Sequence, residues 1–251
     1  MKKTVALIII CFNLTLLSGQ DLSIKNQKIV RNFIETVKTK NKDKICSLVR
    51  YPLTREYPIP EVKNKNELLK RFDEVFDIKL VNLILKSKVN TDWSDVGWRG
   101  IMLFDGEVWL DFDGKLIGVN YQSQFEKKKK EELIKIQRNS LHESLRVFKS
   151  PVCILETSKY RIRIDDMGNN KFRYASWRLQ QNISEKPKML LLDGKVEFDG
   201  SGGNHSYIFK SGKYKYECGI VEMGEDGAPP AYLAVTKGEK VIMSQNAIIK
   251  K

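Results

Sequence analysis

The chain has 251 residues, of which 41% are hydrophobic and 30% are charged, and its formal net charge is +13. This length allows one large domain or two of ordinary size. The apolar and aromatic content excludes a largely disordered chain, because burial of these side chains can offset the entropy that is lost on ordering. A net positive charge is typical of nucleic-acid-binding proteins, but in those proteins the basic residues are concentrated in a patch or groove.

The first twenty residues have the pattern of a secretory signal peptide. Lys2 and Lys3 precede an apolar run over residues 5–17, and Gly19 is the small residue after which cleavage is expected. The run is shorter than the roughly 20 apolar residues of a membrane anchor. We therefore expect residues 1–19 to be removed and the mature chain to be exported, periplasmic or extracellular, without a transmembrane anchor.

The following region is predicted to be helical, because apolar side chains recur every three or four residues up to residue 88. Asp43 is the expected N-cap of a short second helix, and Asn64 with Glu67 forms a capping-box-like start for the next helix. The stretch 51–60 contains three prolines and cannot be helical, so we expect an extended edge strand there.

The hydrophobic period changes from 3.6 to 2 after residue 92. Three apolar runs fill residues 98–121, and the Asp-Gly pairs 105–106 and 113–114 separate them. Asp-Gly suits a two-residue hairpin turn, since both central positions take positive φ. The sequence therefore predicts a three-stranded antiparallel meander.

This order of helices, extended strand and meander resembles the cone-shaped α+β domain of the SnoaL-like, nuclear-transport-factor-like (cystatin-like) superfamily. The segments that carry the resemblance are 42–52, 66–77 and 98–121. It implies a domain over residues 20–124 in which a curved sheet wraps around a helix, often with a pocket at the open end. Trp98, Trp109 and Asp111 are the candidates to line that pocket; the alternative is that the tryptophans belong to the core. The superfamily includes enzymes, binding proteins and scaffolds, so the fold does not fix the function.

Residues 125–150 are predicted to form a linker helix. Its apolar side chains share one helical stripe, and charged residues fill the remaining faces. The stripe consists of Ile134, Leu141, Leu145 and Phe148. We expect the helix to pack against a neighbouring domain and to end at Pro151.

Residues 151–251 alternate apolar and polar side chains in short segments that turn signals divide. About eight strands at this spacing predict a small antiparallel β-barrel or sandwich. In architecture alone this domain resembles the β-barrels of periplasmic C-type lysozyme inhibitors, because the inhibitory Ser and Lys loops of that family are not found here. The whole chain is therefore expected to be α+β.

Export would place the cysteines in an oxidising compartment. Three remain once Cys11 is removed with the signal peptide, so at most one bridge can form within the chain. Cys153 and Cys218 lie in strand-like segments and are the expected pair, whereas Cys46 is expected to be a buried, inert thiol. No Cys/His cluster with metal-ligand spacing occurs in the sequence, so no structural zinc site and no cofactor are predicted.

Candidate chemistry is sparse, since the chain has two histidines and no GxSxG nucleophile elbow. His205 follows a glycine-rich loop with Ser201 and Asn204, and these three are predicted to contact a ligand or partner; the alternative is a wide barrel loop. Glu107, Asp111 and Asp113 share one face of a strand and are candidates for paired carboxylates, but acidic residues at alternate positions also serve solubility. No catalytic residue is assigned.

The basic residues are spread along the chain. The one cluster, Lys127–Lys130, is flanked by glutamates, which argues against a nucleic-acid groove. A diffuse positive surface suits an acidic protein or an anionic glycan better. We therefore expect an exported, non-catalytic envelope protein that binds a macromolecular partner, as an inhibitor or immunity-type protein does. One alternative is a small-ligand carrier or an enzyme that uses the pocket of the N-terminal domain, and another is a structural module of a larger secreted assembly.

Overall fold

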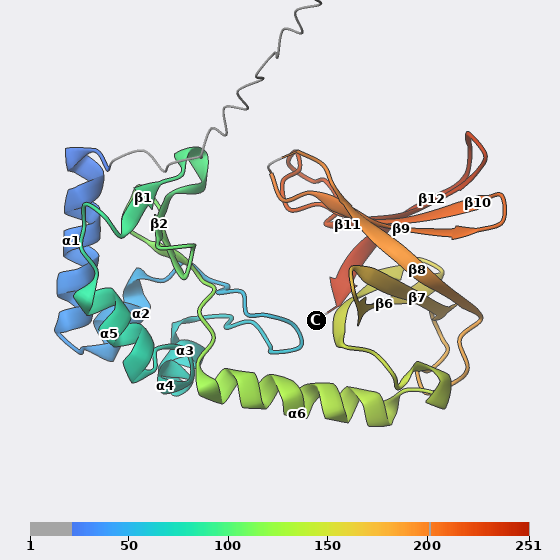
Figure 1. Ribbon diagram of the computed structural model, residues 1–251, viewed down its shortest axis with the longest axis horizontal. Coiled ribbons are helices and arrows are strands. Elements are labelled where there is room, and N and C mark those ends of the chain that lie inside the picture. Colours follow the sequence, from blue (N-terminus) through green and yellow to red (C-terminus); the bar gives the residue numbers. More distant parts are fainter. Residues whose placement is uncertain (1–21, 201, 251) are drawn as a thin grey trace, which may run out of the picture. The chain divides into compact units, whose positions relative to one another are not determined.

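The computed structural model describes residues 22–200 and 202–250, so the predicted signal peptide lies outside the described residues. The chain divides into two compact units. The described part of the first, here called the sheet unit, is residues 22–51 and 78–121; the second, the barrel unit, contains residues 52–77 and those from 122 on. The predicted α+β class is confirmed, with helices and a four-stranded sheet, a linking helix and an eight-stranded barrel (Figure 1). The predicted division into two domains and a linker stays a prediction.

The sheet unit combines three α-helices with an antiparallel sheet of order β1-β2-β3-β4. The predicted meander is confirmed as β2 to β4, and β1 precedes it as a strand that the sequence pattern did not indicate. The predicted two-residue turns are wrong: Gly106 and Gly114 have positive φ but Asp105 and Asp113 do not, and the connections are longer. The elements are α1 (Ile24–Lys38), α2 (Lys42–Leu48), α5 (Ile78–Lys86), β1 (Trp93–Asp95), the 3-10 helix η1 (Gly97–Arg99), β2 (Ile101–Leu103), β3 (Val108–Leu110) and β4 (Leu116–Val119).

Helix α1 is joined to β1 by an aromatic contact and a hydrogen bond. Phe33 is buried, and its ring meets the Trp93 ring edge-on with centroids 6.1 Å apart. Asn26 donates from Nδ2 to Asp95 Oδ2 at 2.7 Å. A strand of three residues, β1 is thus held in place by the helix as well as by the ladder to β2.

Helix α2 begins earlier than predicted. Its N-cap is Asn41, whose side chain accepts a hydrogen bond from the Lys44 backbone N–H, and the predicted cap, Asp43, lies in the first turn. A carboxylate is favourable there as well, next to the positive end of the helix dipole. Two residues that suit a helix start therefore lie within three positions, and the sequence pattern alone does not show which of them is the N-cap.

Residues 52–77 of the barrel unit form an irregular loop and two short helices, α3 (Lys65–Lys70) and α4 (Phe72–Val75). The predicted edge strand over 51–60 is wrong: a single isolated bridge joins Leu53 to Val62. The prolines remove N–H donors, which limits the ladder that this stretch can form. The helix predicted over 66–77 is divided at Arg71, which ends α3 and precedes α4.

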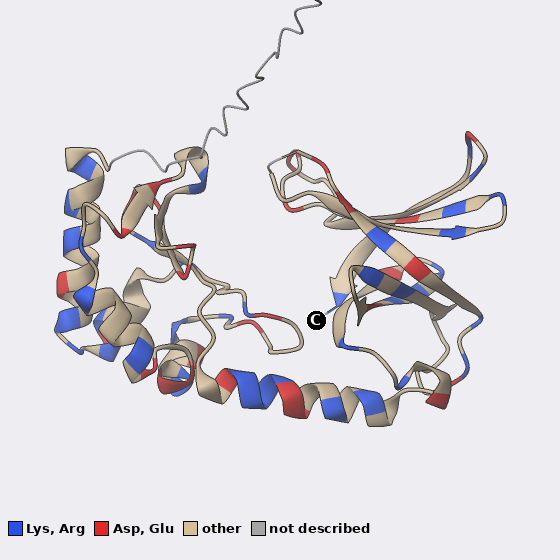
Figure 2. Cartoon of the chain, viewed as in Figure 1, with Lys and Arg blue, Asp and Glu red and all other residues tan. Residues whose placement is uncertain are grey.

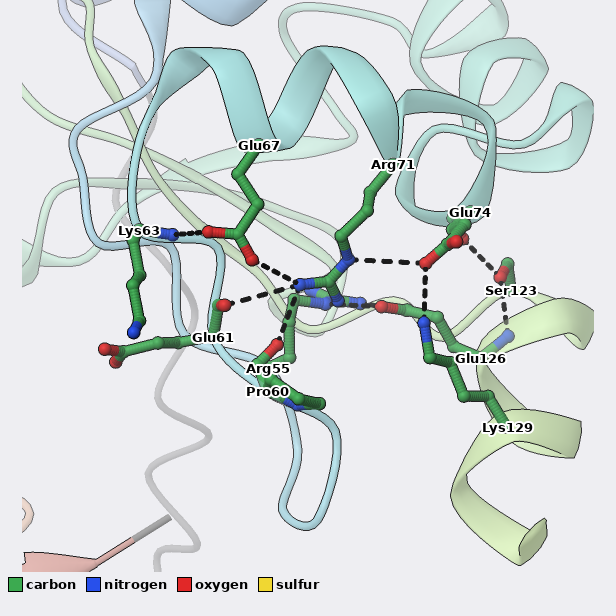
Figure 3. Close-up of polar contacts among 10 residues, drawn as sticks. All are labelled: Arg55, Pro60, Glu61, Lys63, Glu67, Arg71, Glu74, Ser123, Glu126 and Lys129. Atoms are coloured by element: carbon green, nitrogen blue, oxygen red, sulfur yellow. Dashed lines mark hydrogen bonds and ion pairs between the residues drawn. The ribbon is translucent and has the colours of Figure 1, made fainter. Parts of the chain in front are cut away.

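A cluster of charged side chains holds this loop to the long helix α6 (Gln124–Ser140) (Figure 3). Arg55 and Glu126 are 2% and 0% exposed and form a two-pronged pair, in which Arg55 Nε donates to Glu126 Oε1 at 2.8 Å. Arg71 donates from Nη1 to the Pro60 carbonyl at 3.0 Å and from Nε to Glu74 at 3.3 Å. Removing one partner of a buried ion pair costs about 3–5 kcal/mol of unfolding free energy. We therefore interpret the cluster as one that stabilises the fold.

The eight C-terminal strands form a closed antiparallel barrel, as predicted. Neighbours in sequence are neighbours in the barrel, and β12 closes it by pairing with β5. Side chains alternate between the interior and the outer face along each strand. The strands are β5 (Ser150–Thr157), β6 (Tyr160–Gly168), β7 (Lys171–Arg178), β8 (Met189–Phe198), β9 (His205–Ser211), β10 (Tyr214–Ile220), β11 (Ala231–Lys237) and β12 (Lys240–Lys250).

The C-terminal part of α6 and the segment after it pack against β7. The whole predicted apolar stripe is buried in one cluster with Ala175 and Trp177, and its members are Ile134, Leu141, Leu145 and Phe148. The predicted single helix is two segments, because α6 ends at Ser140 and the 3-10 helix η2 (Glu143–Leu145) follows. Burial of the stripe fixes the helix to the barrel without requiring it to be continuous.

The predicted disulfide is not formed, and Cys46, Cys153 and Cys218 are free, buried thiols. Cys153 is on β5 and Cys218 on β10, with β11 and β12 between them. Three strand spacings of about 4.8 Å along the wall exceed the Cα separation of about 7 Å that a bridge allows. Burial raises the pKa of Cys153 to about 12, so this thiol stays protonated at neutral pH.

Candidate functional site

An up-and-down barrel gathers alternate connections at the same end. One end, here called the basic mouth, consists of residues 157–160, 178–189, 210–215 and 237–240. The opposite end, the acidic mouth, consists of residues 149–151, 166–171, 197–200, 202–205, 220–231 and 248–250.

Charge differs between the two mouths. The basic mouth has nine Lys or Arg residues and two Glu, whereas the acidic mouth has six Asp or Glu residues and three Lys. In Figure 2 the ribbon is blue, for Lys and Arg, near the tip of the β9–β10 hairpin and red, for Asp and Glu, in the connection between β10 and β11. The field at the basic mouth therefore attracts anions, and the field at the acidic mouth attracts cations.

The basic mouth contains a cavity of about 770 Å³. This volume lies in the range of roughly 300–1,000 Å³ that is typical of small-molecule sites. Most of its walls are aromatic, aliphatic or methionine side chains, and they come from six strands. The lining residues are Tyr160, Tyr174, Ser176, Trp177, Arg178, Gln181, Lys188, Met189, Tyr216, Leu233, Val235, Ile242 and Met243.

The inner wall of this basic cavity is neutral and fixed, whereas its cations are exposed. Tyr174 and Ser176, at inward positions of β7, are 2% and 6% exposed. The Trp177 ring is buried on the other face of the strand, in the cluster with the apolar stripe, and its indole N–H donates to the Glu185 carbonyl at 2.9 Å. Burial raises the pKa of Tyr174 above the ordinary tyrosine value, so its phenol stays uncharged. Arg178 and Lys188 are exposed. An amphipathic anion matches this arrangement, with its apolar part inside and its charge at the entrance.

The acidic mouth contains a smaller cavity of about 170 Å³. Its deepest lining residues are buried, and one acidic side chain, Glu222, is exposed at its edge. The lining residues are Tyr57, Val152, Cys153, His205, Tyr207, Ile220, Glu222 and Ile249.

One of the residues predicted to contact a ligand, His205, lines this acidic cavity. Asn204 does not line it, but its side chain binds the backbone of the neighbouring connection. Asn204 Oδ1 accepts the backbone N–H groups of Glu222 and Met223 at 2.9 and 2.8 Å. Ser201, the third residue predicted in this loop, lies outside the described residues.

The three candidates in the sheet unit do not line either cavity. Trp98 is 61% exposed in η1. Trp109 donates its indole N–H to the Gly106 carbonyl at 2.9 Å, and Asp111 forms an ion pair with Arg50. Their part in ligand binding stays a prediction.

A third hollow, of about 760 Å³, lies beside the β6–β7 turn and β8. Its lining, over 169–171 and 193–198, is mostly exposed polar side chains, and Gly194 is its one buried lining residue. A hollow without a buried apolar wall gives a small ligand little surface to contact, so we do not interpret it as a site.

Comparison of the chain with family models, curated proteins and solved structures finds no match. The resemblances to the cone-shaped superfamily and to the lysozyme-inhibitor barrels therefore stay predictions. Among the described residues, no group of three or more His, Cys, Asp or Glu side chains is placed to hold a metal ion. None of the helices in residues 22–200 and 202–250 is long and apolar enough to cross a membrane.

Sequence reasoning missed the basic cavity. Its aromatic side chains occupy apolar positions of an alternating pattern, as core residues do. A usable signal was the residue type: Tyr174 and Tyr216, rather than aliphatic side chains, stand at inward positions of β7 and β10. The second signal was the order of the connections. In an up-and-down barrel every second connection lies at the same end, so the lysines of those connections belong to one end.

Proposed function

We propose that the protein binds a small amphipathic anion in the basic cavity of its barrel. The observation that carries the proposal is the combination of a cavity of about 770 Å³ that has apolar, aromatic walls with a mouth of nine basic and two acidic residues. Closed eight-stranded barrels are wide enough to hold one small ligand. Arg178, Gln181 and Lys188 supply the donors for the polar end of the ligand.

The apolar part of the ligand is expected to supply most of the affinity. Burying about 200 Å² of apolar ligand surface is worth about 5 kcal/mol, whereas an exposed ion pair adds at most about 1 kcal/mol. The charges at the basic mouth then select among apolar ligands and speed their association. A test must therefore separate the apolar contribution from the charge.

A matched pair of fluorescent probes makes this separation. The probes are 8-anilinonaphthalene-1-sulfonate and 1-anilinonaphthalene, which lacks the sulfonate. We expect both to bind saturably and the anionic probe to bind about fivefold more tightly. Energy transfer from tryptophan to the probe reports binding, and the variants below locate it.

Two variants locate the binding. Arg178→Gln/Lys188→Gln should weaken the anionic probe about fivefold and leave the neutral probe unchanged. The control Lys171→Gln/Lys195→Gln makes the same change of net charge away from the basic mouth and should affect neither probe. Met243→Trp, a substitution that fills the basic cavity from a half-buried position, should weaken both. Equal binding of both probes to the wild type and to Met243→Trp would contradict the proposal.

We also propose, on a separate observation, that the sheet unit binds an acidic macromolecule, a protein or a glycan. The helical segments 22–51 and 78–88 contain eleven Lys or Arg residues and two acidic ones, whereas residues 89–121 contain two and six. In Figure 2 blue segments, which mark Lys and Arg, recur along the ribbon of α1. Lys25, Lys28 and Arg31 are exposed and follow one another at helical spacing on α1. A face of this kind suits the partner that the sequence predicts for an inhibitor or immunity-type protein.

Binding to immobilised polyglutamate and heparin at physiological salt tests this second proposal. The variant Lys25→Gln/Lys28→Gln/Arg31→Gln should weaken binding roughly tenfold, because three adjacent charges are removed from one face. The control Lys149→Gln/Lys171→Gln/Lys195→Gln removes three exposed charges from the barrel unit, outside the basic mouth. Equal losses in the two variants would show that total charge, and not the face of α1, governs binding.

A further inference from the structure

The acidic cavity differs from the proposed anion site in its size and in the chemistry of its lining, and it takes no part in that site. Cys153, Tyr207 and Ile220 are buried at its floor, while Tyr57 and His205 are half-buried at its side. Its volume of about 170 Å³ accommodates a molecule of a few heavy atoms. The cavity lies at the opposite end of the barrel from the anion site, so a ligand here would be a second one.

The polar groups of this cavity are mainly acceptors. His205 Nδ1 lies 2.8 Å from the Gly203 carbonyl oxygen, which can only accept, so the proton of the neutral ring is on Nδ1 and Nε2 keeps its lone pair. The carboxylate of Glu222 is the charged group of the lining, and it too can only accept. A ligand that fits these groups brings hydrogen-bond donors or a positive charge.

Glu222 is held at the cavity by Asn204. The Asn204 side chain accepts two backbone N–H groups, of Glu222 and Met223, and donates from Nδ2 to the Met223 carbonyl at 2.9 Å. This three-bond clamp fixes the backbone of the connection beside the start of β9, where His205 lies. The carboxylate is thus positioned by the fold and not only by its own side-chain torsions.

Aromatic rings supply the remaining wall. The ring centroids of His205 and Tyr207 are 5.4 Å apart, and those of Tyr207 and Phe172 are 4.9 Å apart. Burial raises the pKa of Tyr207, so its ring stays a neutral phenol. Neutral rings beside a carboxylate attract alkylated ammonium groups through the ring quadrupole, and the excess of acidic residues at this mouth favours the same charge.

We propose that the acidic cavity binds a small alkylammonium ion. The methyl or methylene groups of the ligand contact Val152, Ile220 and Ile249, and its positive charge faces Glu222, His205 and the tyrosine rings. The thiol of Cys153 at the floor stays protonated and acts as a neutral apolar surface. This site is independent of the anion site and of the basic face of α1.

Choline and its neutral isostere 3,3-dimethyl-1-butanol test the proposal by titration against the ¹⁵N-labelled full-length protein. We expect choline to shift the amide resonances of His205 and Glu222 saturably, and the isostere to bind at least about tenfold more weakly. Glu222→Gln should weaken choline roughly fivefold. Glu225→Gln removes the same charge from the same connection without touching the cavity, and should change the affinity less than twofold.

Three results would overturn the proposal: absence of saturable shifts up to 100-fold molar excess of choline, equal binding of the isostere, or equal losses in Glu222→Gln and Glu225→Gln. The third result would mean that choline responds to the diffuse field of the mouth and occupies no defined site. Binding of 8-anilinonaphthalene-1-sulfonate to the same samples keeps the outcome separate from that of the anion site, since the two ligands should not compete.

Discussion

The two mouths of the barrel differ although the same eight strands build both. The basic mouth opens into a cavity of about 770 Å³ with aromatic and methionine walls, whereas the acidic mouth has a cavity of about 170 Å³ beside Tyr57. The difference arises from chain direction, because consecutive connections of an up-and-down barrel alternate between the ends. A net charge that looks diffuse along the sequence is therefore separated in space.

The interior of the barrel divides the two cavities. Along β9, His205 and Tyr207 line the acidic cavity, and Phe209 follows at the next inward position. The Phe209 ring packs 5.5 Å from the ring of Tyr174, which lines the basic cavity. Phe209 also covers Gly194, where an added Cβ would lie 2.1 Å from the ring. Phe209 is thus a central member of the buried cluster that lies between the cavities.

Phe209→Ala should therefore have the largest effect. Phe209 is 1% exposed, and truncation of a buried phenylalanine costs about 3–5 kcal/mol of unfolding free energy. Urea denaturation measures the loss, and Phe125→Ala, at a position 52% exposed on α6, is the control with a cost below about 1 kcal/mol. In the folded Phe209→Ala variant the anionic and cationic probes should no longer bind independently. A loss below 1 kcal/mol would show that Phe209 does not support the barrel core.

Raising the pH should destabilise the barrel through the thiol at the floor of the acidic cavity. Burial raises the pKa of Cys153 from 9.0 to about 12. The unfolded chain releases this proton first, so the stabilisation is complete below about pH 9 and is lost as the pH rises toward 12. At pH 10 Cys153 alone should lower the unfolding free energy by about 1.4 kcal/mol. Urea denaturation at pH 8 and pH 10 measures the change.

Cys153→Ala is the control for this pH effect. It should lose stability at pH 8 and show a smaller further loss between pH 8 and pH 10. Burial raises the pKa of Cys218 in the same direction, so part of the pH dependence should remain. Equal unfolding free energies of the wild type at the two pH values, or rapid reaction of the native thiols with Ellman's reagent at pH 8, would contradict the buried, protonated state.

Local signals in the sequence predicted much of the fold. Asn64 caps α3 by accepting the Glu67 N–H at 3.0 Å, as its capping pattern indicates. The apolar stripe through Ile134 and Phe148 is buried against the barrel even though the helix ends between them. These predictions succeeded because helix capping and amphipathic spacing depend on residues within a few positions of each other.

Features that depend on distant partners were not predictable in this way. Helix 66–77 is divided at Arg71, whose guanidinium is drawn to the Pro60 carbonyl. The predicted disulfide between Cys153 and Cys218 was wrong because both residues lie in strands, but these strands are not neighbours in the barrel. The sequence pattern indicates which segments are strands and does not indicate which strands pair. His205 was identified from its glycine-rich loop, but the cavity around it also needs Tyr57, which comes from a loop about 150 residues away in the sequence.

Asn204→Ala should have a smaller, local effect at the acidic mouth. It removes the acceptor of two N–H groups and one donor at the edge of the barrel, where water can replace part of the loss, so we expect a cost of about 1 kcal/mol in unfolding free energy. Choline affinity should fall about threefold, because Glu222 is no longer fixed. Binding of the anionic naphthalene probe at the basic mouth should not change.

Asn204→Asp is the matched variant for this prediction. It keeps an acceptor for the two N–H groups and adds a negative charge at the acidic mouth, so choline affinity should be retained or increased. Equal weakening of choline by both substitutions would mean that the clamp is not what positions Glu222.

The smallest expected effect is that of salt on ligand binding. It compares the attraction of charged ligands by the two mouths most directly. From 0.01 M to 0.1 M ionic strength the Debye length falls from about 30 Å to about 10 Å. Both charged ligands should bind about threefold more weakly at the higher salt, because each is attracted by the excess charge of its own mouth, and 1-anilinonaphthalene should be unaffected. Isothermal titration at the two salt concentrations measures all three. A response of the anionic probe alone would mean that choline is held by short-range contacts with Glu222 and the rings, whereas no response of either would show that the segregated charge does not act on ligands.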